Sequence, residues 1–199
     1  MVENFIAQKD LQVLDTSLSR RQLIKGVRNL GLLMATPSLL TLSSKVFASI
    51  PEKSLNVYNT HTGESLKKCT FWLDGKLNVE AMAELNRLFR DHRTNQECTM
   101  DPNLMHLIHN ILEKTGSQQM IHLISGYRSP KTNTMLRKKS CGVASNSQHL
   151  TGKAADIMLP DRTMKQVQQA AKSLKAGGVG RYAQFVHIDT GRVRYWGPA

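Results

Sequence analysis

The amino-acid sequence predicts an α+β fold in which helices pack on a small antiparallel β-sheet. Strand-like and helical segments follow one another in unequal blocks, unlike the regular alternation of a doubly wound fold. Two segments rich in β-branched and aromatic residues, 54–59 and 68–73, flank a turn at Thr62-Gly63 and predict a β-hairpin. Apolar residues at helical spacing between 104 and 112 predict an amphipathic helix.

Two helices are expected after the hairpin. Asn78 is placed to cap the first helix, and the basic segment 90–93 closes it. Gly116 ends the second helix, because glycine readily adopts the left-handed conformation that follows a last helical turn. The apolar faces are Met82, Leu85, Leu88 and Phe89 in the first helix and Leu104, Leu107, Ile108, Ile111 and Leu112 in the second.

Short strands and helices continue through the second half of the chain. Strands are expected at 120–125, 153–159, 184–189 and 192–196, and helices at 131–139 and from Met164 to Gly177. A polar loop, 140–148, precedes the strand at 153–159. Thr190-Gly191 lies between the last two strands and predicts a hairpin there.

The first 48 residues have the layout of a signal peptide. Arg20-Arg21 matches a twin-arginine signal, which directs the export of folded proteins. The uncharged stretch 29–44 is short for a membrane span, and Val46-Phe47-Ala48 offers small residues for signal peptidase. We therefore expect a periplasmic domain at residues 49–199. An ordinary secretory signal and a retained N-terminal anchor are the alternatives.

The chain is basic, which bears on its partners. Its net charge is +12, and removal of the first 48 residues, which hold six Lys/Arg and three Asp/Glu, leaves +9. In a cytosolic protein this charge would suggest nucleic-acid binding, whereas an export signal points to an anionic cell-wall polymer or to membrane headgroups. We therefore expect no nucleic-acid partner and no membrane span once the signal is removed. General surface charge is the competing interpretation.

Three cysteines, Cys69, Cys98 and Cys141, leave at least one thiol unpaired, so the fold is not a disulfide-stapled scaffold. Their spacing also lacks the paired pattern of a structural zinc site. We interpret the cysteines as structural residues and consider a Cys69–Cys98 bridge.

Two histidines and an aspartate carry the predicted chemistry. His149 and Asp156 lie seven residues apart, and His187 follows 31 residues later. Two imidazoles and a carboxylate are the ligand set of a catalytic zinc, which keeps its fourth position for water, whereas structural zinc has four protein ligands. Bound zinc lowers the pKa of that water and polarises a carbonyl group, so the pattern predicts hydrolysis without a covalent intermediate.

The predicted strands suggest how these three residues meet. Small residues at 152, 154 and 155 leave room for the chain to fold back between His149 and Asp156. If the strand of His187 pairs with the strand of Asp156, both side chains can point to one face of the sheet. Asp189 would share that face, because alternate residues of a strand point the same way.

The segment around these residues resembles a known family. Residues 147–156 match the pattern S-x-H-x-x-G-x-A-x-D at every specified position, which resembles the signature of zinc D-alanyl-D-alanine peptidases and the lysostaphin-related superfamily. Ser125-Gly126-Tyr127-Arg128-Ser129 and the ending at 187–196 narrow the resemblance to the YcbK-like branch of murein endopeptidases. The similarity covers residues 55–197.

This resemblance implies a hedgehog-like α+β fold, Zn²⁺ as the cofactor and cleavage of peptide crosslinks in peptidoglycan. It assigns the metal to His149, Asp156 and His187. Residues 49–199 would then be a zinc peptidase domain, and we expect it to be a monomer. Other metals, such as iron or manganese, can occupy similar ligand sets.

The resemblance also suggests residues that act on the substrate. Arg128 matches a family arginine that meets a substrate carboxylate or the developing oxyanion, with a structural salt bridge as the alternative. Ser147 is a candidate for substrate binding or, more simply, a cap of the loop. Tyr127 is a further candidate for substrate binding, although Tyr127 and Trp196 are of types found more often in a core or a cleft wall than in catalysis.

One departure from the family pattern concerns the general base. Dipeptidase and carboxypeptidase relatives carry a glutamate two positions before the last histidine ligand, and Phe185 stands there in this chain. Asp189 is the candidate base, because it shares a strand face with His187. An orienting role for Asp189 behind His187 is an equal alternative.

Three functions are compared on these grounds. The missing glutamate at Phe185 favours crosslink cleavage over removal of a terminal D-alanine. A non-catalytic peptidoglycan-binding protein with a structural metal remains the alternative outside enzymology. His106 and His109 lie three residues apart on the expected helix, a spacing that could bind metal, but no carboxylate accompanies them in a recognised pattern. We therefore interpret both as exposed or satisfied histidines. His61, His92 and His122 carry no motif and are interpreted as structural.

Overall fold

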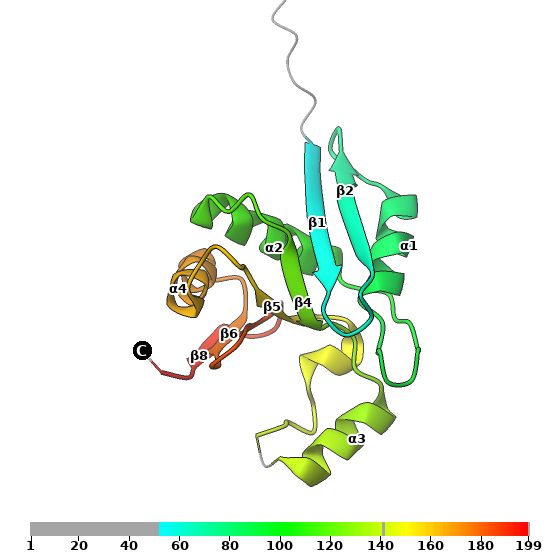
Figure 1. The fold of residues 1–199 in the computed structure, drawn as a ribbon, viewed down its shortest axis with the longest axis vertical. Coiled ribbons are helices and arrows are strands. Elements are labelled where there is room, and N and C mark those ends of the chain that lie inside the picture. The colour runs from blue at the N-terminus through cyan, green and yellow to red at the C-terminus, as the bar shows by residue number, and fades with distance from the viewer. Residues whose placement is uncertain (1–51, 141, 199) are drawn as a thin grey trace, which may run out of the picture. The chain divides into compact units, whose positions relative to one another are not determined.

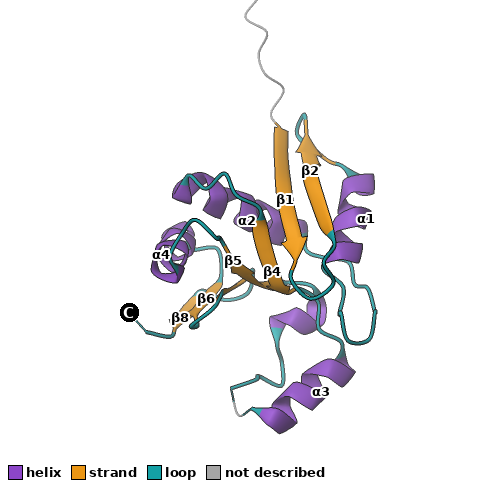
Figure 2. Cartoon of the chain, viewed as in Figure 1, coloured by secondary structure: helices purple, strands orange, loops and turns teal. Residues whose placement is uncertain are grey.

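The computed structural model describes residues 52–140 and 142–198 (Figure 1). The described residues form one mixed sheet in the order β3-β2-β1-β4-β5-β7-β6-β8, with helices against it (Figure 2). The strands are β1 (Glu52–Asn59), β2 (Ser65–Leu73), β3 (Lys76–Leu77), β4 (Ile121–Ser125), β5 (Ala154–Met158), β6 (Gly178–Arg181), β7 (Val186–Asp189) and β8 (Arg194–Trp196). The helices are α1 (Val79–Leu88), α2 (Pro102–Thr115), α3 (Pro130–Lys139), the 3-10 helix η1 (Gln148–Thr151) and α4 (Met164–Leu174).

The expected α+β class is confirmed, but the expectation of a small antiparallel sheet is wrong. The sheet has eight strands, and two of its pairs, β1 with β4 and β6 with β8, are parallel. A parallel pair needs a long crossover, and α1 and α2 supply it between β1 and β4. The β-hairpin of β1 and β2 is confirmed as an antiparallel pair.

Helix boundaries follow from local capping. The Asn78 side chain accepts a hydrogen bond from Ala81 N, as its predicted capping role requires. Asp101 caps α2 in the same way, and Gly116 ends that helix with a φ of 62°. Helix α4 ends earlier than Gly177, because Lys175 already adopts the left-handed conformation with a φ of 51°.

The hydrophobic core lies between the sheet and its helices. The predicted apolar faces of α1 and α2 are buried, and their side chains pack against inward residues of β1, β2 and β4. The largest fully buried members are Phe71, Phe89, Leu55, Leu85, Met100, Leu104, Met105, Ile108, Ile111, Ile121, Leu123 and Ile157. This core fixes β4 and β5, and Asp156 lies in the middle of β5.

The expected hairpin of the last two strands is wrong. Strand β7 pairs with β5 on one side and with β6 on the other, so β8 pairs with β6 instead. Between β7 and β8 the chain turns around the Asp189 carboxylate, which accepts hydrogen bonds from Gly191 N and the Arg194 guanidinium. Strand β6 was not predicted, because Gly178 and Gly180 resemble a turn in the sequence.

The proposed Cys69–Cys98 bridge is also wrong, since both thiols are free. Cys69 is buried, and its thiol donates to the carbonyl oxygen of Ala81. The thiol of Cys98 instead faces the carbonyl of Thr99. Cys141 and the expected signal peptide lie outside the described residues. Within the described ranges, no helix has both the length and the apolar character needed to cross a membrane.

A buried carboxylate joins the segment after α1 to the start of α3. Asp91 is only 1% exposed, and its two oxygens accept hydrogen bonds from Arg93 N and Ser129 N, both at 2.9 Å. Burial by itself would raise the pKa of Asp91, but these hydrogen bonds lower it below the usual value. Because Ser129 directly follows Arg128, this contact also holds the segment that carries the arginine of the site.

We expect Asp91→Asn to lower the free energy of unfolding by about 1–3 kcal/mol at pH 7, since an amide cannot accept both hydrogen bonds. The depressed folded-state pKa means that the carboxylate contributes above the unfolded pKa, about 3.9, and loses its effect as the pH falls. Urea unfolding with a chelator present, at pH 7 and pH 3, measures both effects. The exposed Glu97→Gln is the control, and an equal loss at both pH values would contradict this account.

Candidate metal centre

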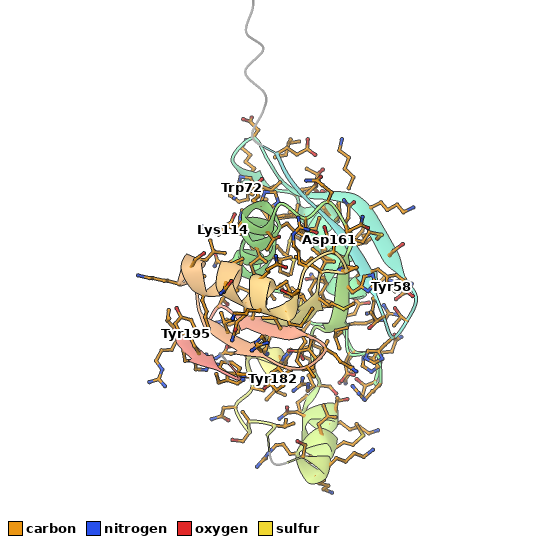
Figure 3. The ribbon with its side chains drawn as sticks, turned by 60° about the vertical axis from the view of Figure 1, so that its left-hand side comes forward. Tyr58, Trp72, Lys114, Asp161, Tyr182 and Tyr195 are labelled. Atoms are coloured by element: carbon orange, nitrogen blue, oxygen red, sulfur yellow. The ribbon has the colours of Figure 1, made fainter. Side chains whose placement is uncertain are left out.

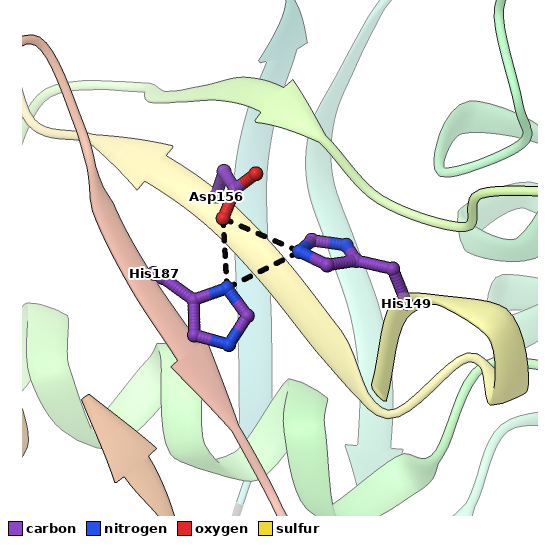
Figure 4. A group of neighbouring side chains, drawn as sticks. All are labelled: His149, Asp156 and His187. Atoms are coloured by element: carbon purple, nitrogen blue, oxygen red, sulfur yellow. Dashed lines mark hydrogen bonds and ion pairs between the residues drawn. The ribbon is translucent and has the colours of Figure 1, made fainter. Parts of the chain in front are cut away.

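Three buried side chains converge on one point beside β5 and β7 (Figure 4). His149 Nε2 lies 3.2 Å from His187 Nδ1 and 3.3 Å from Asp156 Oδ1. The third side of this triangle, from His187 Nδ1 to Asp156 Oδ1, is 2.9 Å. The three residues predicted to bind a metal therefore offer three ligand atoms to a common centre.

The backbone explains why these residues meet. Asp156 and His187 are direct cross-strand partners in the antiparallel pair of β5 and β7, as the predicted strand pairing requires. His149 lies on η1, which begins at the last residue of the expected polar loop. Gly152 ends η1 with a φ of 68°, and a Cβ there would meet the carbonyl oxygen of Thr99. Gly152 thus lets the chain turn sharply between His149 and Asp156.

Each imidazole has an inner nitrogen, which faces the other two ligand residues, and an outer nitrogen, which faces away from them. The hydrogen-bond partner of the outer nitrogen determines whether the inner nitrogen carries a hydrogen. His149 Nδ1 lies 2.6 Å from the carbonyl oxygen of Gly126, and His187 Nε2 lies 3.0 Å from Asp189 Oδ2. Both oxygens can only accept, so each outer nitrogen carries the hydrogen. In the neutral imidazoles the inner nitrogens then have a free lone pair and face the Asp156 oxygen as acceptors.

Three acceptors at such short distances are unfavourable unless a positive charge, either a proton or a metal ion, lies between them. The surrounding charges agree with this need. Burial by itself would raise the pKa of Asp156, but the two imidazoles lower it. Burial would likewise lower the pKa of His187, but the neighbouring carboxylates of Asp156 and Asp189 raise it, because they stabilise positive charge on the imidazole. Bonds of about 2.0–2.2 Å from zinc to nitrogen and oxygen ligands let one ion reach all three atoms.

Asp189 lies behind His187, on the side away from the three ligand atoms. It is fully buried, and its oxygens accept from His187 Nε2, Arg194, Gly178 N and Gly191 N at 2.7–3.1 Å. Burial raises the pKa of Asp189, yet these hydrogen bonds lower it overall. This geometry favours the orienting role over that of a general base, because the lone pairs of the carboxylate are already engaged.

Glycine at 178 makes room for this arrangement. A Cβ at Gly178 would meet Asp189 Oδ2 and the Arg194 guanidinium. The sequence analysis did not identify Gly178, Arg194 or the Gly126 carbonyl as parts of the site. The alternation of glycine in Gly178-Val179-Gly180, next to a strand with histidine and aspartate, was the available signal.

A cleft of about 240 Å³ opens onto the three ligand residues. Arg128 lines this cleft, with its Nη2 atom 3.5 Å from Asp156 Oδ2. Its side chain is 12% exposed, and its Nε has no hydrogen-bond partner in the described part of the chain. Burial lowers the pKa of Arg128, and the charge of Asp156 opposes this shift. A buried guanidinium with an unused donor suits an anionic or carbonyl oxygen in the cleft.

The other predicted substrate residues differ in position. Ser147 lines the cleft, and its hydroxyl also accepts from His149 N at 3.4 Å as the cap of η1. Tyr127 packs against the hydrophobic core and is not part of the cleft wall. Phe185 and Trp196 lie in that wall, together with Tyr182. The position at which some relatives have glutamate is therefore part of an aromatic surface.

The remaining histidines have other contacts, as expected. His106 Nδ1 meets Lys53 Nζ, while His109 Nδ1 meets the Ser54 carbonyl oxygen. The rings of His61 and His92 stack on each other, and His122 packs edge-on against Tyr58. Among the described residues, the only group of three or more potential ligands is the one formed by His149, Asp156 and His187.

Comparisons with known proteins show which family the chain resembles. The model of the family Peptidase_M15_2, described as peptidoglycan L,D-endopeptidase MepK, matches residues 48–196. The chain is 39% identical over 183 residues to peptidoglycan L,D-endopeptidase MepK of Escherichia coli strain K12, covering 89% of this chain and 97% of that protein. It is 41% identical over 163 residues to the probable peptidoglycan L,D-endopeptidase MepK of Haemophilus influenzae, covering 80% and 87%.

The position of Asp189 leads to a test of its role. In Asp189→Asn the amide can turn its NH₂ group toward His187 Nε2 and favour the tautomer with hydrogen on Nδ1. We expect the affinity for Zn²⁺ to fall about 10- to 100-fold, as for other residues that orient a metal ligand. Competition with a chromogenic chelator measures this change, with Asp161→Asn on the surface as the control. Unchanged affinity in Asp189→Asn would contradict the orienting role.

Proposed function

Because this chain belongs to the Peptidase_M15_2 family, we propose that it is a zinc-dependent peptidoglycan endopeptidase that cuts peptide crosslinks of the cell wall. The observation that carries the proposal is the triangle of acceptor atoms from His149, Asp156 and His187 at the floor of the cleft. The relatives are named L,D-endopeptidases, and we extend this bond preference to the present chain.

The ligand set supports zinc as the metal. Two imidazole nitrogens and one carboxylate oxygen are typical of catalytic zinc, and the cleft leaves the fourth side open to water or substrate. When bound, the metal would supply an activated water and polarise the scissile carbonyl group. The protein holds the imidazoles ready for this task through Gly126 O and Asp189, so little reorganisation is needed.

Arg128 is proposed to stabilise charge on the substrate. Its guanidinium lies beside Asp156 at the edge of the metal site, and its unused Nε can donate to an oxygen that becomes negative during hydrolysis. Burial strengthens such a hydrogen bond, because little water competes for the donor. Ser147 would line the same cleft, mainly as the cap that holds His149 in place.

The aromatic wall supports cleavage within a crosslink rather than at a chain end. Position 185 is the one at which dipeptidase and carboxypeptidase relatives carry a glutamate. In this chain it is Phe185, whose ring stacks on that of Tyr182 with the ring centroids 4.6 Å apart. The general base is therefore not at position 185, and we assign Asp189 to positioning His187. Peptidoglycan lies outside the cytoplasm, so the domain is proposed to act there, and the twin-arginine signal at residues 1–48 remains a prediction.

Digestion of purified crosslinked muropeptides tests this function. We expect the protein at residues 49–199 to cleave L,D crosslinks when loaded with Zn²⁺ and to lose activity with a chelator. His187→Ala should lose at least about 10³-fold in rate together with its bound metal, because the ligand set is then incomplete. The exposed His61→Ala is the matched control. Product masses from chromatography and mass spectrometry measure the outcome.

Two other results would favour the rival functions. Release of terminal D-alanine with crosslinks left intact would indicate a carboxypeptidase. Zinc-loaded protein that cleaves nothing, yet sediments with purified cell walls, would indicate a binding protein. Either result would overturn the endopeptidase proposal.

A further inference from the structure

Tyr182 occupies a place in the cleft for which the proposed function gives no role. It follows β6 directly, and its backbone N–H donates to the Phe185 carbonyl oxygen at 3.0 Å across the turn to β7. Gly180 pairs with His187 in the sheet. Because side chains alternate along a strand, Tyr182 lies on the face of Gly180 and His187, above the metal site.

The phenol oxygen of Tyr182 is held by a donor. Trp196 Nε1 donates a hydrogen bond to this oxygen at 3.0 Å. An indole N–H can only donate, so the phenol accepts in this contact, and its own hydrogen stays free for another partner. The described residues provide no acceptor for that hydrogen, while the side chain is 42% exposed along the wall of the cleft.

The ring of Tyr182 is fixed by its neighbours. Phe185 stacks against it with an interplanar angle of 23°. Trp196 is itself fixed, because its indole lies over Gly180, where a Cβ would collide with it, and the Arg194 guanidinium lies 5.2 Å from the ring. Gly180 thus makes room for the indole that orients the phenol. A tyrosine that served only as an apolar surface for the substrate would not need its hydroxyl group to be fixed in this way.

The surroundings of the phenol indicate what its hydrogen meets. The Trp196 ring lies 5.2 Å from the His187 ring, so the group that holds the phenol touches the metal site. Arg128 lines the same cleft as Tyr182. Two donors, the phenol just after β6 and the guanidinium in the segment between β4 and α3, therefore line one opening over the ligand atoms.

We propose that Tyr182 is a catalytic residue whose phenolic hydrogen is donated to the carbonyl oxygen of the scissile bond as negative charge develops there. This inference rests on the proposed endopeptidase function. The hydrogen bond forms as the carbonyl carbon becomes tetrahedral, and no proton is transferred. A donor that is fixed before the reaction stabilises the transition state more than the ground state, so its loss should lower kcat rather than raise KM.

Tyr182→Phe removes the hydroxyl and keeps the aromatic surface. We expect kcat on crosslinked muropeptides to fall about 100-fold, as when one donor to a developing oxyanion is removed, with little change in KM. Trp196→Phe should also lower kcat, because the phenol of Tyr182 then loses the hydrogen bond that fixes its position. The matched control is Tyr195→Phe on β8, whose hydroxyl donates to the Lys172 carbonyl oxygen away from the cleft. Figure 3 labels the two tyrosines at separate positions beside the last strands.

A binding measurement complements the kinetics. A phosphinate peptide that replaces the scissile amide should bind zinc-loaded Tyr182→Phe about 100-fold more weakly than wild type, in keeping with transition-state complementarity. The cleaved peptide products should bind both proteins equally, and zinc content should not change. Calorimetry measures these affinities.

The outcomes separate this inference from the proposed function. If wild type cleaves crosslinks and Tyr182→Phe does so at the same kcat, the role of Tyr182 is wrong and the endopeptidase function stands. An increase in KM alone would also overturn it, because this would show that Tyr182 is only a binding surface. If wild type cleaves nothing, both proposals fall together.

Discussion

The structure depends on one constraint: three hydrogen-bond acceptors face one another at the floor of the cleft. His149 Nε2, His187 Nδ1 and Asp156 Oδ1 lie within 3.3 Å of one another. Such a group is unfavourable without a positive charge, and the hydrogen bonds of Gly126 O and Asp189 direct the imidazole hydrogens away from it. The fold therefore maintains an arrangement that is stabilised by a bound metal ion.

The C-terminal strands couple this site to the cleft wall. Asp189 connects His187 to Arg194, and Arg194 in turn lies against the ring of Trp196. Glycines at 178 and 180 on β6 leave space for the ion pair of Asp189 with Arg194 and for the indole of Trp196. Strand β6 thus makes room both for the residues that orient the metal ligand and for those that shape the substrate surface.

Local pattern predicted well which candidate ligands would meet, but it predicted the sheet less well. The meeting of Asp156 and His187 followed from strand alternation, because a two-residue period fixes which side chains share a face. The order of the strands in the sheet could not be predicted from this alternation. Which strand pairs beside β7 depends on long-range packing, and two glycines concealed β6 in the sequence. The role of Asp189 was equally open, because the hydrogen bonds that its oxygens accept from Arg194, Gly178 N and Gly191 N depend on the fold.

Zinc K-edge X-ray absorption of the metal-loaded protein tests the central claim most directly. The account predicts one ion per chain with two imidazole nitrogens, one carboxylate oxygen and one further light atom as ligands. His149→Ala and His187→Ala should each remove one imidazole from the spectrum. A spectrum with sulfur ligands, or one with both imidazoles still present in His187→Ala, would contradict the assignment of the metal to this site.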